Sequence, residues 1–390
     1  MKAIDPKAYW IWLQHALGAG SSKQNRILSG YATLADFYRA GREGWLLEGY
    51  FSPKELRALG AYSIDEAQAL LEYCKKIGQW VMTPESPDYP EPLRQIHNPP
   101  CVLYGKGRLP DFEEVPAVSI VGTRKATATG KTAARSFAFE LARKGFAVVS
   151  GGALGVDTAA HQGALQAGGL TVCVLGCGIE TEYLMVNASM RDAIAAKGAL
   201  ISEYPPQTQP TGSNFPIRNR IISGLSLGTL VVEAAAKSGS LITADFALEQ
   251  GRDVFAVPAG IFSPVSEGVN NLIKCGAKPV SRANDILEEY YSRFPEKIHL
   301  DVEKSDVIIE DNELPAPPVD SKFCKKKDLE GVFSEDARKL YSCLGPEPHH
   351  ISELESLAGI PAARLLSAVT ELELEEKIVS HSGRRFSLPR

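Results

Sequence analysis

The sequence predicts an α/β protein with a doubly wound, mostly parallel sheet, a small all-α region before it and a winged-helix domain after it. Three observations support this prediction. Short apolar runs alternate with amphipathic helical segments through the middle of the chain, whereas residues 6–80 show only helical periodicity. The last sixty residues contain three helical segments followed by a hairpin pattern.

The amino-terminal region is expected to form several compact helices. Its apolar positions repeat at helical spacing, and breaks at residues 18–22, 41–44 and 51–53 separate the segments. The break GAGSSK at residues 18–23 resembles a helix-hairpin-helix turn, whose backbone amides bind DNA phosphates, but it lacks the usual L-P-G-[IV]-G form. Packing between helices is therefore the favoured interpretation, and a DNA contact is the alternative.

A proline-rich bridge over residues 84–100 leads into a regular alternation of strands and helices. The expected strands are Val118–Val121, Ala147–Ser150, Thr171–Leu175, Ala199–Ser202, Thr229–Val232 and Val254–Val257. The expected helices are Lys131–Lys144, Val156–Ala167, Ser189–Ala196, Asn214–Leu225, Leu241–Gln250 and Asn270–Gly276. Near-continuous apolar strands joined by helices indicate a parallel sheet that is covered on both faces. Ligands of such sheets bind beyond the carboxyl ends of the strands, where Gly122, Gly151 and Gly176 lie.

The end of the chain predicts a linker and a separate domain. Residues 294–329 are rich in charges and prolines, which is typical of a mobile linker. The tail then predicts helices over 334–344, 351–358 and 361–376, and a hairpin turning at Ser382 and Gly383, which is the winged-helix pattern. 

The third helix of this pattern has an acidic composition, with Glu371, Glu373, Glu375 and Glu376. Direct reading of a DNA groove by this helix is therefore disfavoured. Arg384 and Arg385 in the hairpin are candidates for phosphate contact, with a solvated hairpin or a protein-docking module as the alternatives.

Composition narrows the class of protein. The formal net charge of −5 requires any polyanion to bind at a local basic patch. Seven cysteines without a C-x-x-C pair indicate reduced thiols, with neither a disulfide framework nor a metal site. The apolar amino-terminal stretch is broken by Gln14 and His15, and no run of some twenty apolar residues occurs. We therefore expect a soluble cytoplasmic protein without a membrane partner.

The stretch AVSIVGTRKATATGKT at residues 117–132 predicts a buried strand, a glycine-bracketed loop and the start of a helix. Free backbone N–H groups and the positive end of a helix dipole attract anions to such a turn. Arg124 and Lys125 lie inside the loop. The stretch therefore predicts a phosphate site.

Three glycine loops fail the spacing rules of nucleotide cofactors. Seven residues separate Gly122 from the G-K-T at residues 130–132, whereas a P-loop has four residues between its glycines. The loop SGGALGVD at residues 150–157 lacks the G-x-G-x-x-G order, and LGCGIET at residues 175–181 has threonine in place of the third glycine. We therefore expect no nucleotide cofactor.

Asp157 and His161 lie at positions i and i+4 of an expected helix, so their side chains share one face and can form an acid/base pair. The favoured interpretation is structural, with Asp157 complementing the helix start and His161 packed beneath it. No cysteine or serine lies in a recognisable activated motif. The sequence therefore assigns no catalytic residue.

The segment SNFPIRNRIISG at residues 213–224 combines cations with an aromatic residue. Arg218, Asn219 and Arg220 fall in the first turns of the expected helix, where two arginines oppose the dipole unless they reach an anion. Phe215 beside them offers a face on which a base can stack. The alternative places Phe215 in the core and pairs the arginines with surface carboxylates. Because Arg124 lies at the same sheet edge, binding of single-stranded nucleic acid is favoured.

Five segments, in this order and spacing, closely resemble the DNA processing protein A (DprA, also called Smf) family. They are IVGTR, VVSGGALGVDTAAHQGAL, NFPIRNRIISGLS, VVEAAAKSGSLITADFALEQGRDVFAVPAG and GVNNLIKCGA, within residues 81–290. The resemblance implies a helical, sterile-alpha-motif-like domain at 1–80 and a Rossmann-like DNA-binding domain at 81–292. It further implies a linker at 293–330 and a winged-helix domain at 331–390.

The resemblance also implies a function. Members of the family are non-catalytic proteins that protect incoming single-stranded DNA during natural transformation and load the RecA recombinase onto it. They form homodimers through the late part of the Rossmann-like domain, here about residues 243–290. The family's pocket arginine corresponds to Arg124, and its phosphate-gripping residues lie in the segment that contains Arg218 and Arg220. The residues expected to bind single-stranded DNA are Gly122, Thr123, Arg124, Lys125, Ser150, Gly151, Gly152, Asn214, Phe215, Arg218, Asn219, Arg220 and Lys237.

Two other classes of protein remain open at this point. A nucleotide-phosphate hydrolase resembling the phosphoribohydrolases would use Glu233 or Asp157 as its acid, but LGTLVVE at residues 227–233 only partly matches their P-G-G-x-G-T-x-x-E signature. The other class is a scaffolding adaptor without nucleic-acid affinity. Release of free base from nucleoside monophosphates would indicate the hydrolase. A DNA titration without any binding signal would indicate the adaptor.

Overall fold

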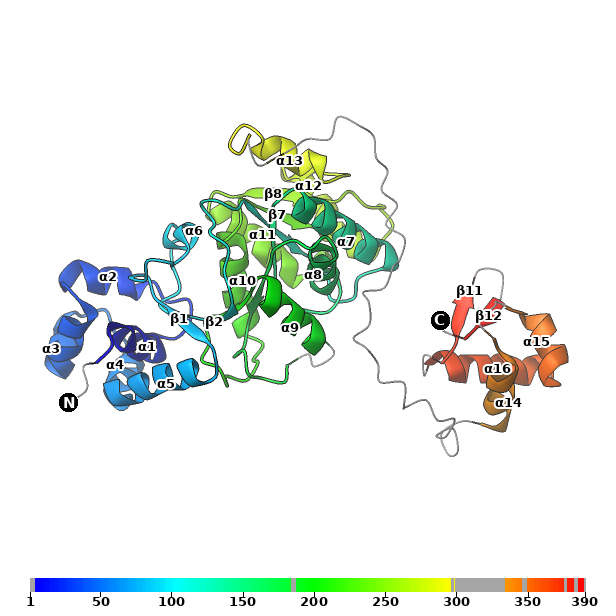
Figure 1. The fold of residues 1–390 in the computed structure, drawn as a ribbon, viewed down its shortest axis with the longest axis horizontal. Coiled ribbons are helices and arrows are strands. Elements are labelled where there is room, and N and C mark those ends of the chain that lie inside the picture. Colours follow the sequence, from blue (N-terminus) through cyan, green and yellow to red (C-terminus); the bar gives the residue numbers. More distant parts are fainter. Residues whose placement is uncertain are drawn as a thin grey trace. The chain divides into compact units, whose positions relative to one another are not determined.

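The computed structural model describes residues 4–183, 187–295, 298, 334–345, 349–374, 377–381 and 385–388. The chain divides into two compact units, residues 1–312 and residues 313–390, and each is considered by itself (Figure 1). Nearly all of the predicted linker, and the predicted hairpin turn with Arg384, lie outside the described residues.

A nine-stranded sheet forms the centre of the first unit, with the strand order β1-β2-β6-β5-β4-β3-β7-β8-β9. The strands are β1 (Trp80–Met82), β2 (Leu103–Gly107), β3 (Ala117–Val121), β4 (Ala147–Ser150), β5 (Thr171–Leu175), β6 (Ala199–Ser202), β7 (Gly228–Val231), β8 (Asp253–Ala256) and β9 (Lys278–Pro279). Strands β6 to β9 in this order run parallel, whereas β1 and β2 join one edge antiparallel. The predicted mostly parallel α/β sheet is confirmed.

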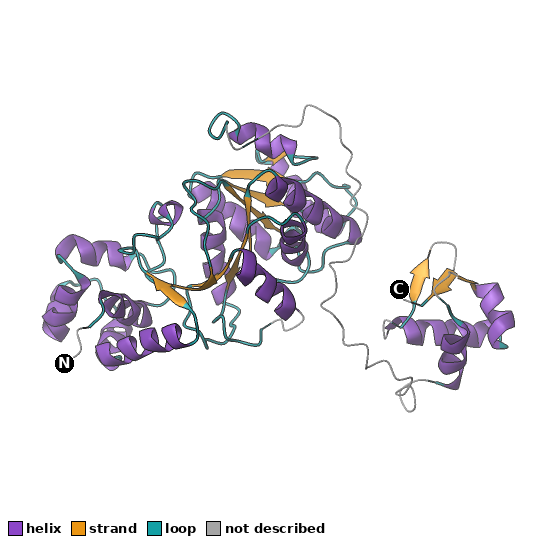
Figure 2. Ribbon diagram, in the orientation of Figure 1, coloured by secondary structure: helices purple, strands orange, loops and turns teal. Residues whose placement is uncertain are grey.

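Helices cover both faces of this sheet (Figure 2). One face carries α7 (Ala128–Arg143), α8 (Val156–Gln166), α9 (Ala188–Lys197) and α13 (Asn284–Tyr290). The other carries α6 (Glu91–Arg94), α10 (Asn214–Gly224), α11 (Gly239–Glu249) and α12 (Glu267–Lys274). The six strands predicted from the sequence are buried, except for exposed Asp253 at the start of β8, because both of their faces pack against helices. This double cover leaves the strand ends as the place where loops meet.

Five helices precede the sheet: α1 (Pro6–Leu17), α2 (Lys23–Gly30), α3 (Leu34–Leu47), α4 (Pro53–Ala61) and α5 (Ile64–Lys76). Local signals define their starts, since Ser52 and Ser63 each form a capping box with the glutamate three residues later. The predicted break at 41–44 is a kink inside α3, where Gly41 has a φ of 61°. The all-α amino-terminal region is thus confirmed.

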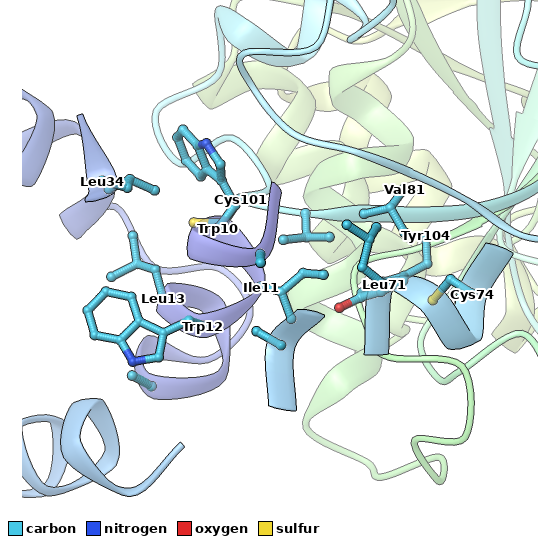
Figure 3. Close-up of a cluster of buried hydrophobic side chains, with 14 of the residues drawn as sticks. Trp10, Ile11, Trp12, Leu13, Leu34, Leu71, Cys74, Val81, Cys101 and Tyr104 are labelled. Atoms are coloured by element: carbon cyan, nitrogen blue, oxygen red, sulfur yellow. The ribbon is translucent and has the colours of Figure 1, made fainter. Parts of the chain in front are cut away.

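The amino-terminal helices share a hydrophobic core with the edge of the sheet (Figure 3). Trp10 and Leu13 of α1 and Leu71 of α5 belong to the same buried cluster as Val81 of β1 and Tyr104 of β2. Burial of three tryptophans and several leucines removes a large apolar area from water. The helices and the sheet therefore form one compact unit.

The second unit has three helices and a small sheet. Its elements are α14 (Glu335–Cys343), β10 (His349–His350), α15 (Ile351–Ala358), α16 (Ala362–Leu374), β11 (Val379–His381) and β12 (Arg385–Ser387). The strands pair antiparallel in the order β10-β12-β11 around a core that includes Leu340, Leu354 and Leu372. This arrangement confirms the predicted winged-helix domain. None of the helices in the described parts of either unit has the length and apolar character needed to cross a lipid bilayer.

Candidate nucleic-acid binding site

A pocket of about 510 Å³ lies at the carboxyl edge of the sheet. Four segments form it: the loop after β3, the loop after β4 with the start of α8, the first turns of α10, and the start of α11. Six of the predicted site residues line the pocket, namely Gly122, Thr123, Arg124, Phe215, Arg218 and Asn219. The topology thus brings together residues that are almost a hundred positions apart in the chain.

Phe215 lies between two arginines. The guanidinium carbon of Arg124 is 5.0 Å from the centre of the Phe215 ring, and that of Arg218 is 5.9 Å from it. Tyr183 adds a second aromatic ring, with its centroid 5.4 Å from that of Phe215. The ring's π face attracts both cations, and Arg124 is exposed to solvent. An exposed guanidinium beside an aromatic ring can meet both a phosphate and a base.

The guanidinium of Arg218 is buried and only partly used by the protein. Its side chain is 4% exposed, Nη1 donates to the carbonyl oxygens of Gly151 (2.7 Å) and Val174, and Nε donates to Oδ1 of Asn219 at 3.2 Å. Nη2 has no hydrogen-bond acceptor among the residues that the structure describes. Burial lowers the pKa of Arg218, and the charge of Asp157 opposes that shift. The free Nη2 donor is therefore available for an anion in the pocket.

Asp157 places a carboxylate in the wall of the same pocket. Its Oδ2 accepts a hydrogen bond from the backbone N–H of Ala153 at 3.3 Å. Burial raises the pKa of Asp157 to about 6, although the charge of Arg218 works in the opposite direction. A Cβ atom at Gly151 would lie 2.7 Å from Asp157 Oδ2 and 2.7 Å from each terminal nitrogen of Arg218. Gly151 therefore permits the close approach of this charge pair.

His161 does not form a bond with Asp157 in the described structure. Its Nδ1 lies 2.7 Å from Oγ1 of Thr171, which itself donates to the carbonyl of Val148. Because the hydroxyl proton is used there, the proton of this hydrogen bond lies on Nδ1. The buried Nε2 has no hydrogen-bond partner among the described residues, as expected for a neutral ring. Burial lowers the pKa of His161 to about 3. This geometry agrees with the structural interpretation of the pair.

A carboxylate of the protein itself, that of Glu233, occupies the start of α7. Glu233 accepts hydrogen bonds from the backbone N–H of Thr127 (2.9 Å) and from its hydroxyl (2.5 Å). A Cβ at Gly130 would overlap this carboxylate, so glycine makes room for it. The predicted phosphate at this helix start is wrong, because Glu233 already complements the helix dipole. The start of α11 does line the pocket, through residues 238–240.

Arg220 lies outside the pocket lining. Its side chain is 1% exposed and forms two hydrogen bonds with the carboxylate of Glu203, at 2.8 and 2.7 Å. The same carboxylate accepts from the backbone N–H of Gly20 at 3.2 Å, and Arg220 Nε donates to the carbonyl of Asn98 at 3.1 Å. The turn GAGSSK therefore packs against α10 through a protein carboxylate, as the favoured interpretation expected.

The remaining predicted residues surround the pocket without lining it. Lys125 and Lys237 are exposed, and Asn214 begins α10. Ser150 is buried and donates to the carbonyl of Ile120 at 2.7 Å, while Gly152 has a φ of 68°. No group of three or more potential metal-ligating side chains occurs within the described ranges.

The start of α11 is not among the site residues predicted from the sequence. Ser238 accepts a hydrogen bond from the backbone N–H of Ser240 and caps this helix. A serine directly before Gly239 and an apolar helical run is a recognisable cap signal, so the helix start could have been identified. The position of this helix start in the pocket could not have been identified from the sequence, because that position depends on the packing of α11 against α10.

Comparison with protein families identifies this architecture. A family model described as DNA recombination-mediator protein A matches residues 80–291, which is more than half of the chain. The chain belongs to that family. A second model, described as the DprA winged helix domain, matches residues 313–384.

Curated relatives and solved structures agree with the family model. DNA processing protein DprA of Bacillus subtilis is 42% identical over 243 residues, which cover 62% of this chain and 78% of that protein. Protein Smf of Escherichia coli is 36% identical over 308 residues, covering 78% of this chain and 76% of that one. The X-ray structure of DNA processing protein A from Streptococcus pneumoniae is 32% identical, covers 71% of this chain and 95% of its own, and has a TM-score of 0.61. The resemblance noted in the sequence is thereby confirmed.

Proposed function

We propose that this member of the family binds single-stranded DNA in the pocket at the carboxyl edge of the sheet. The single observation that supports this most strongly is Phe215 between Arg124 and Arg218. Single-strand binding requires an aromatic face for a base together with cations for the backbone, and this cluster supplies both. The net charge of −5 is no obstacle, because the cations are concentrated at one site.

The structure supports a division of roles within the pocket. Arg218 Nη2 and the start of α11 provide donors for one phosphate, and the exposed Arg124 meets a neighbouring phosphate or a base stacked on Phe215. Lys125 and Lys237 are exposed near the rim and hold flanking phosphates. Arg220 acts indirectly, because its ion pair with Glu203 fixes α10 in place.

The same geometry supports binding without catalysis. The two candidate acids of a hydrolase are engaged, since Glu233 caps α7 and Asp157 accepts from Ala153. An unpaired, unstacked base is needed to reach Phe215, which is recessed in the pocket. The pocket therefore favours single strands over duplex DNA.

At the level of the cell, the proposal is that the protein protects incoming single-stranded DNA during natural transformation and loads RecA recombinase onto it in the cytoplasm. This part rests on the family resemblance. A homodimer through about residues 243–290 would place two pockets on one strand. Exposed Leu248 lies at a surface cavity whose lining also includes Leu272, Cys275 and the charged residues Arg252, Asp253, Lys278 and Glu289, and this mixed surface supports a protein contact in the region.

The test of the binding site is a filter-binding titration with single- and double-stranded DNA over a salt series. If about four phosphates are neutralised per pocket, the logarithm of affinity falls against the logarithm of salt concentration with a slope of about −3. Arg124→Ala is expected to weaken single-strand binding by about tenfold, because it removes one cation that contacts the strand. Arg218→Glu is expected to abolish binding at physiological salt.

The matched control is Arg57→Ala, which removes an exposed cation from α4 and leaves the pocket intact. Wild-type affinity in both pocket variants, with unchanged thermal melting, would refute the site. Release of free base from nucleoside monophosphates would favour the hydrolase class instead. A flat titration with every DNA would favour the adaptor class.

A further inference from the structure

Two large apolar side chains protrude from the loop after β8. Phe262 is 94% exposed and its neighbour Ile261 is 81% exposed. Full exposure of a phenylalanine gives up the favourable free energy of burying its ring, and two such residues in succession form an apolar patch rather than a scattered contact. The described fold offers these side chains no packing partner of its own.

Hydrogen bonds fix the conformation of the loop that carries these two side chains. The side chain of Asn270 on α12 bonds both to the carbonyl of Ala259 (3.0 Å) and to its N–H (3.4 Å). The N–H of Ser263 donates to the carbonyl of Gly260 at 3.1 Å, which closes a tight turn around the two apolar residues. The backbone therefore presents Ile261 and Phe262 to solvent in a defined position.

A short chain of contacts connects this loop to the pocket. The loop enters α12, where the N–H of Gly268 donates to the carbonyl of Ala234 at 2.8 Å. A Cβ atom at Gly268 would lie 2.6 Å from the carbonyl oxygen of Ala235, so glycine permits this close approach. That carbonyl accepts from the N–H of Ser238, which lines the pocket. In Figure 1 the labels of β7, β8, α11 and α12 lie together, in agreement with these contacts.

One exposed cation lies on the segment that leads from β7 to the pocket. Lys237 is exposed on the segment that joins Ala235 to Ser238. Residues 257–266 contain no carboxylate. Along the carboxyl edge the loops therefore provide, in order, the arginine and phenylalanine pocket at β3, a lysine after β7 and an exposed phenylalanine after β8. Neighbouring strands are about 4.8 Å apart, so the step from β3 to β8 is about 10 Å.

We propose that Phe262, with Ile261, is a second stacking platform for the single strand that leaves the pocket over Lys237. Alternation of a cation with aromatic faces is what a sequence-independent single-strand track requires, because every base has a π face and every step has a phosphate. This inference rests on the proposed function of the pocket, and it assigns the direction in which the strand runs: along the sheet edge, from β3 toward β8.

The experiment compares two oligonucleotides with the full-length protein. A short oligonucleotide fills the pocket alone, and a long one also reaches the loop after β8. Phe262→Ala is expected to weaken binding of the long oligonucleotide by about fivefold or more, as for the loss of one stacked base, and to leave the short one unchanged. Leu47→Ala on α3 is the control, since that side chain is 88% exposed far along the chain from the pocket segments.

A second measurement reports contact directly. A long oligonucleotide with a single 5-iodouracil at successive positions is irradiated on the wild-type protein, and peptides are mapped by mass spectrometry. An adduct on residues 258–266 at positions outside the pocket supports the platform.

Three outcomes would overturn it. Wild-type affinity of Phe262→Ala for the long oligonucleotide is the first, and an equal loss for both lengths is the second. The third is a Phe262→Ala variant that binds DNA as the wild type does but no longer sediments as a dimer. That result would assign the patch to contact with a second copy of the chain. Failure of the pocket itself is distinguishable, because Arg124→Ala then binds both lengths as the wild type does.

Discussion

Arg218 and Arg220 differ by two positions on α10 but serve different surfaces. Two residues are about 200° apart around a helix, so a single ligand cannot meet both side chains. Arg218 faces the pocket with Nη2 free of protein acceptors, whereas Arg220 is neutralised by Glu203 on the side of the amino-terminal helices. At the scale of single residues, the environment of each charge decides its role.

The carboxylate of Asp157 opposes phosphate binding in the same pocket. Because burial raises its pKa to about 6, a fall in pH from 7 to 5 protonates Asp157 and leaves the charge of Arg218 uncompensated. We expect the affinity for single-stranded DNA to rise over this range. Asp157→Asn should bind more tightly at pH 7 and lose this part of the pH dependence. Titrations of both proteins at constant ionic strength check this, and parallel pH profiles would contradict it.

His161 gives the fold a dependence on pH. Burial lowers its pKa from 6.5 to about 3, so the unfolded chain binds a proton in this window that the folded chain does not. Stability present above pH 6.5 is therefore lost as the pH falls, by about 1.4 kcal/mol per unit.

The raised pKa of Asp157 increases the free energy of unfolding as the pH falls below about 6, which opposes the effect of His161. The contribution of His161 is therefore measured by comparing the wild type with a variant at this position. The free energy of unfolding of His161→Asn, relative to that of the wild type, is expected to rise by about 2 kcal/mol between pH 7 and pH 5. Urea denaturation at both pH values measures it. A constant difference between the two proteins would show that His161 is not buried as a neutral group.

At the scale of elements, one ion pair joins three segments of the first unit. Glu203 follows β6, Arg220 belongs to α10, and Gly20 lies in the turn between α1 and α2. A buried charge that loses its partner stays desolvated and unpaired, which costs more than the pair itself contributes.

We therefore expect Arg220→Met to lower the free energy of unfolding by about 3–5 kcal/mol. The double variant Arg220→Met with Glu203→Leu should recover part of the loss, because no lone charge remains. Lys23→Ala is the contrast, since its ion pair with Glu55 is partly exposed and contributes about 1 kcal/mol or less. Chemical denaturation compares the variants, and a small effect of Arg220→Met would contradict this role.

At the scale of the whole molecule, the two units have separate hydrophobic cores. The charges of α16 are largely used inside the second unit. Glu371 accepts from the N–H (2.7 Å) and hydroxyl (2.6 Å) of Ser334, and Arg364 pairs with Asp336 at 2.7 Å. This helix has few cations left to present to a DNA groove.

A chain that ends at Asn312 is therefore expected to keep the fold and the pocket of the first unit. Its affinity for single-stranded DNA should stay within about twofold of the full-length value, since the pocket residues all lie in that unit. Calorimetry should show that the transition of the first unit is unchanged. A large loss of affinity with an intact transition would assign a DNA contact to the second unit.

The sequence predicted the parts of the fold that depend on local pattern. The strands β3 to β8 begin and end within one residue of their expected bounds, because buried parallel strands are short apolar runs between loops. The strands β1, β2 and β9 were not predicted. β1 and β9 are the edge strands of the sheet, and β2 lies between β1 and β6. These runs of two to five residues carry little periodicity of their own, so their extended conformation depends on pairing with a neighbour, as Val81 does with Tyr104.

The candidate site likewise has features that follow from local sequence and features that depend on tertiary packing. Sequence alone determined that Arg124, Phe215 and Arg218 belong to one place, because loops at the carboxyl ends of parallel strands meet at one edge. Only the tertiary structure decided that Glu233 fills the start of α7, that Arg220 turns away to Glu203, and that α11 opens onto the pocket. These contacts join residues that are distant in the chain, and the packing of the helices on the sheet sets their geometry. The spacing of residues along the sequence therefore cannot predict them.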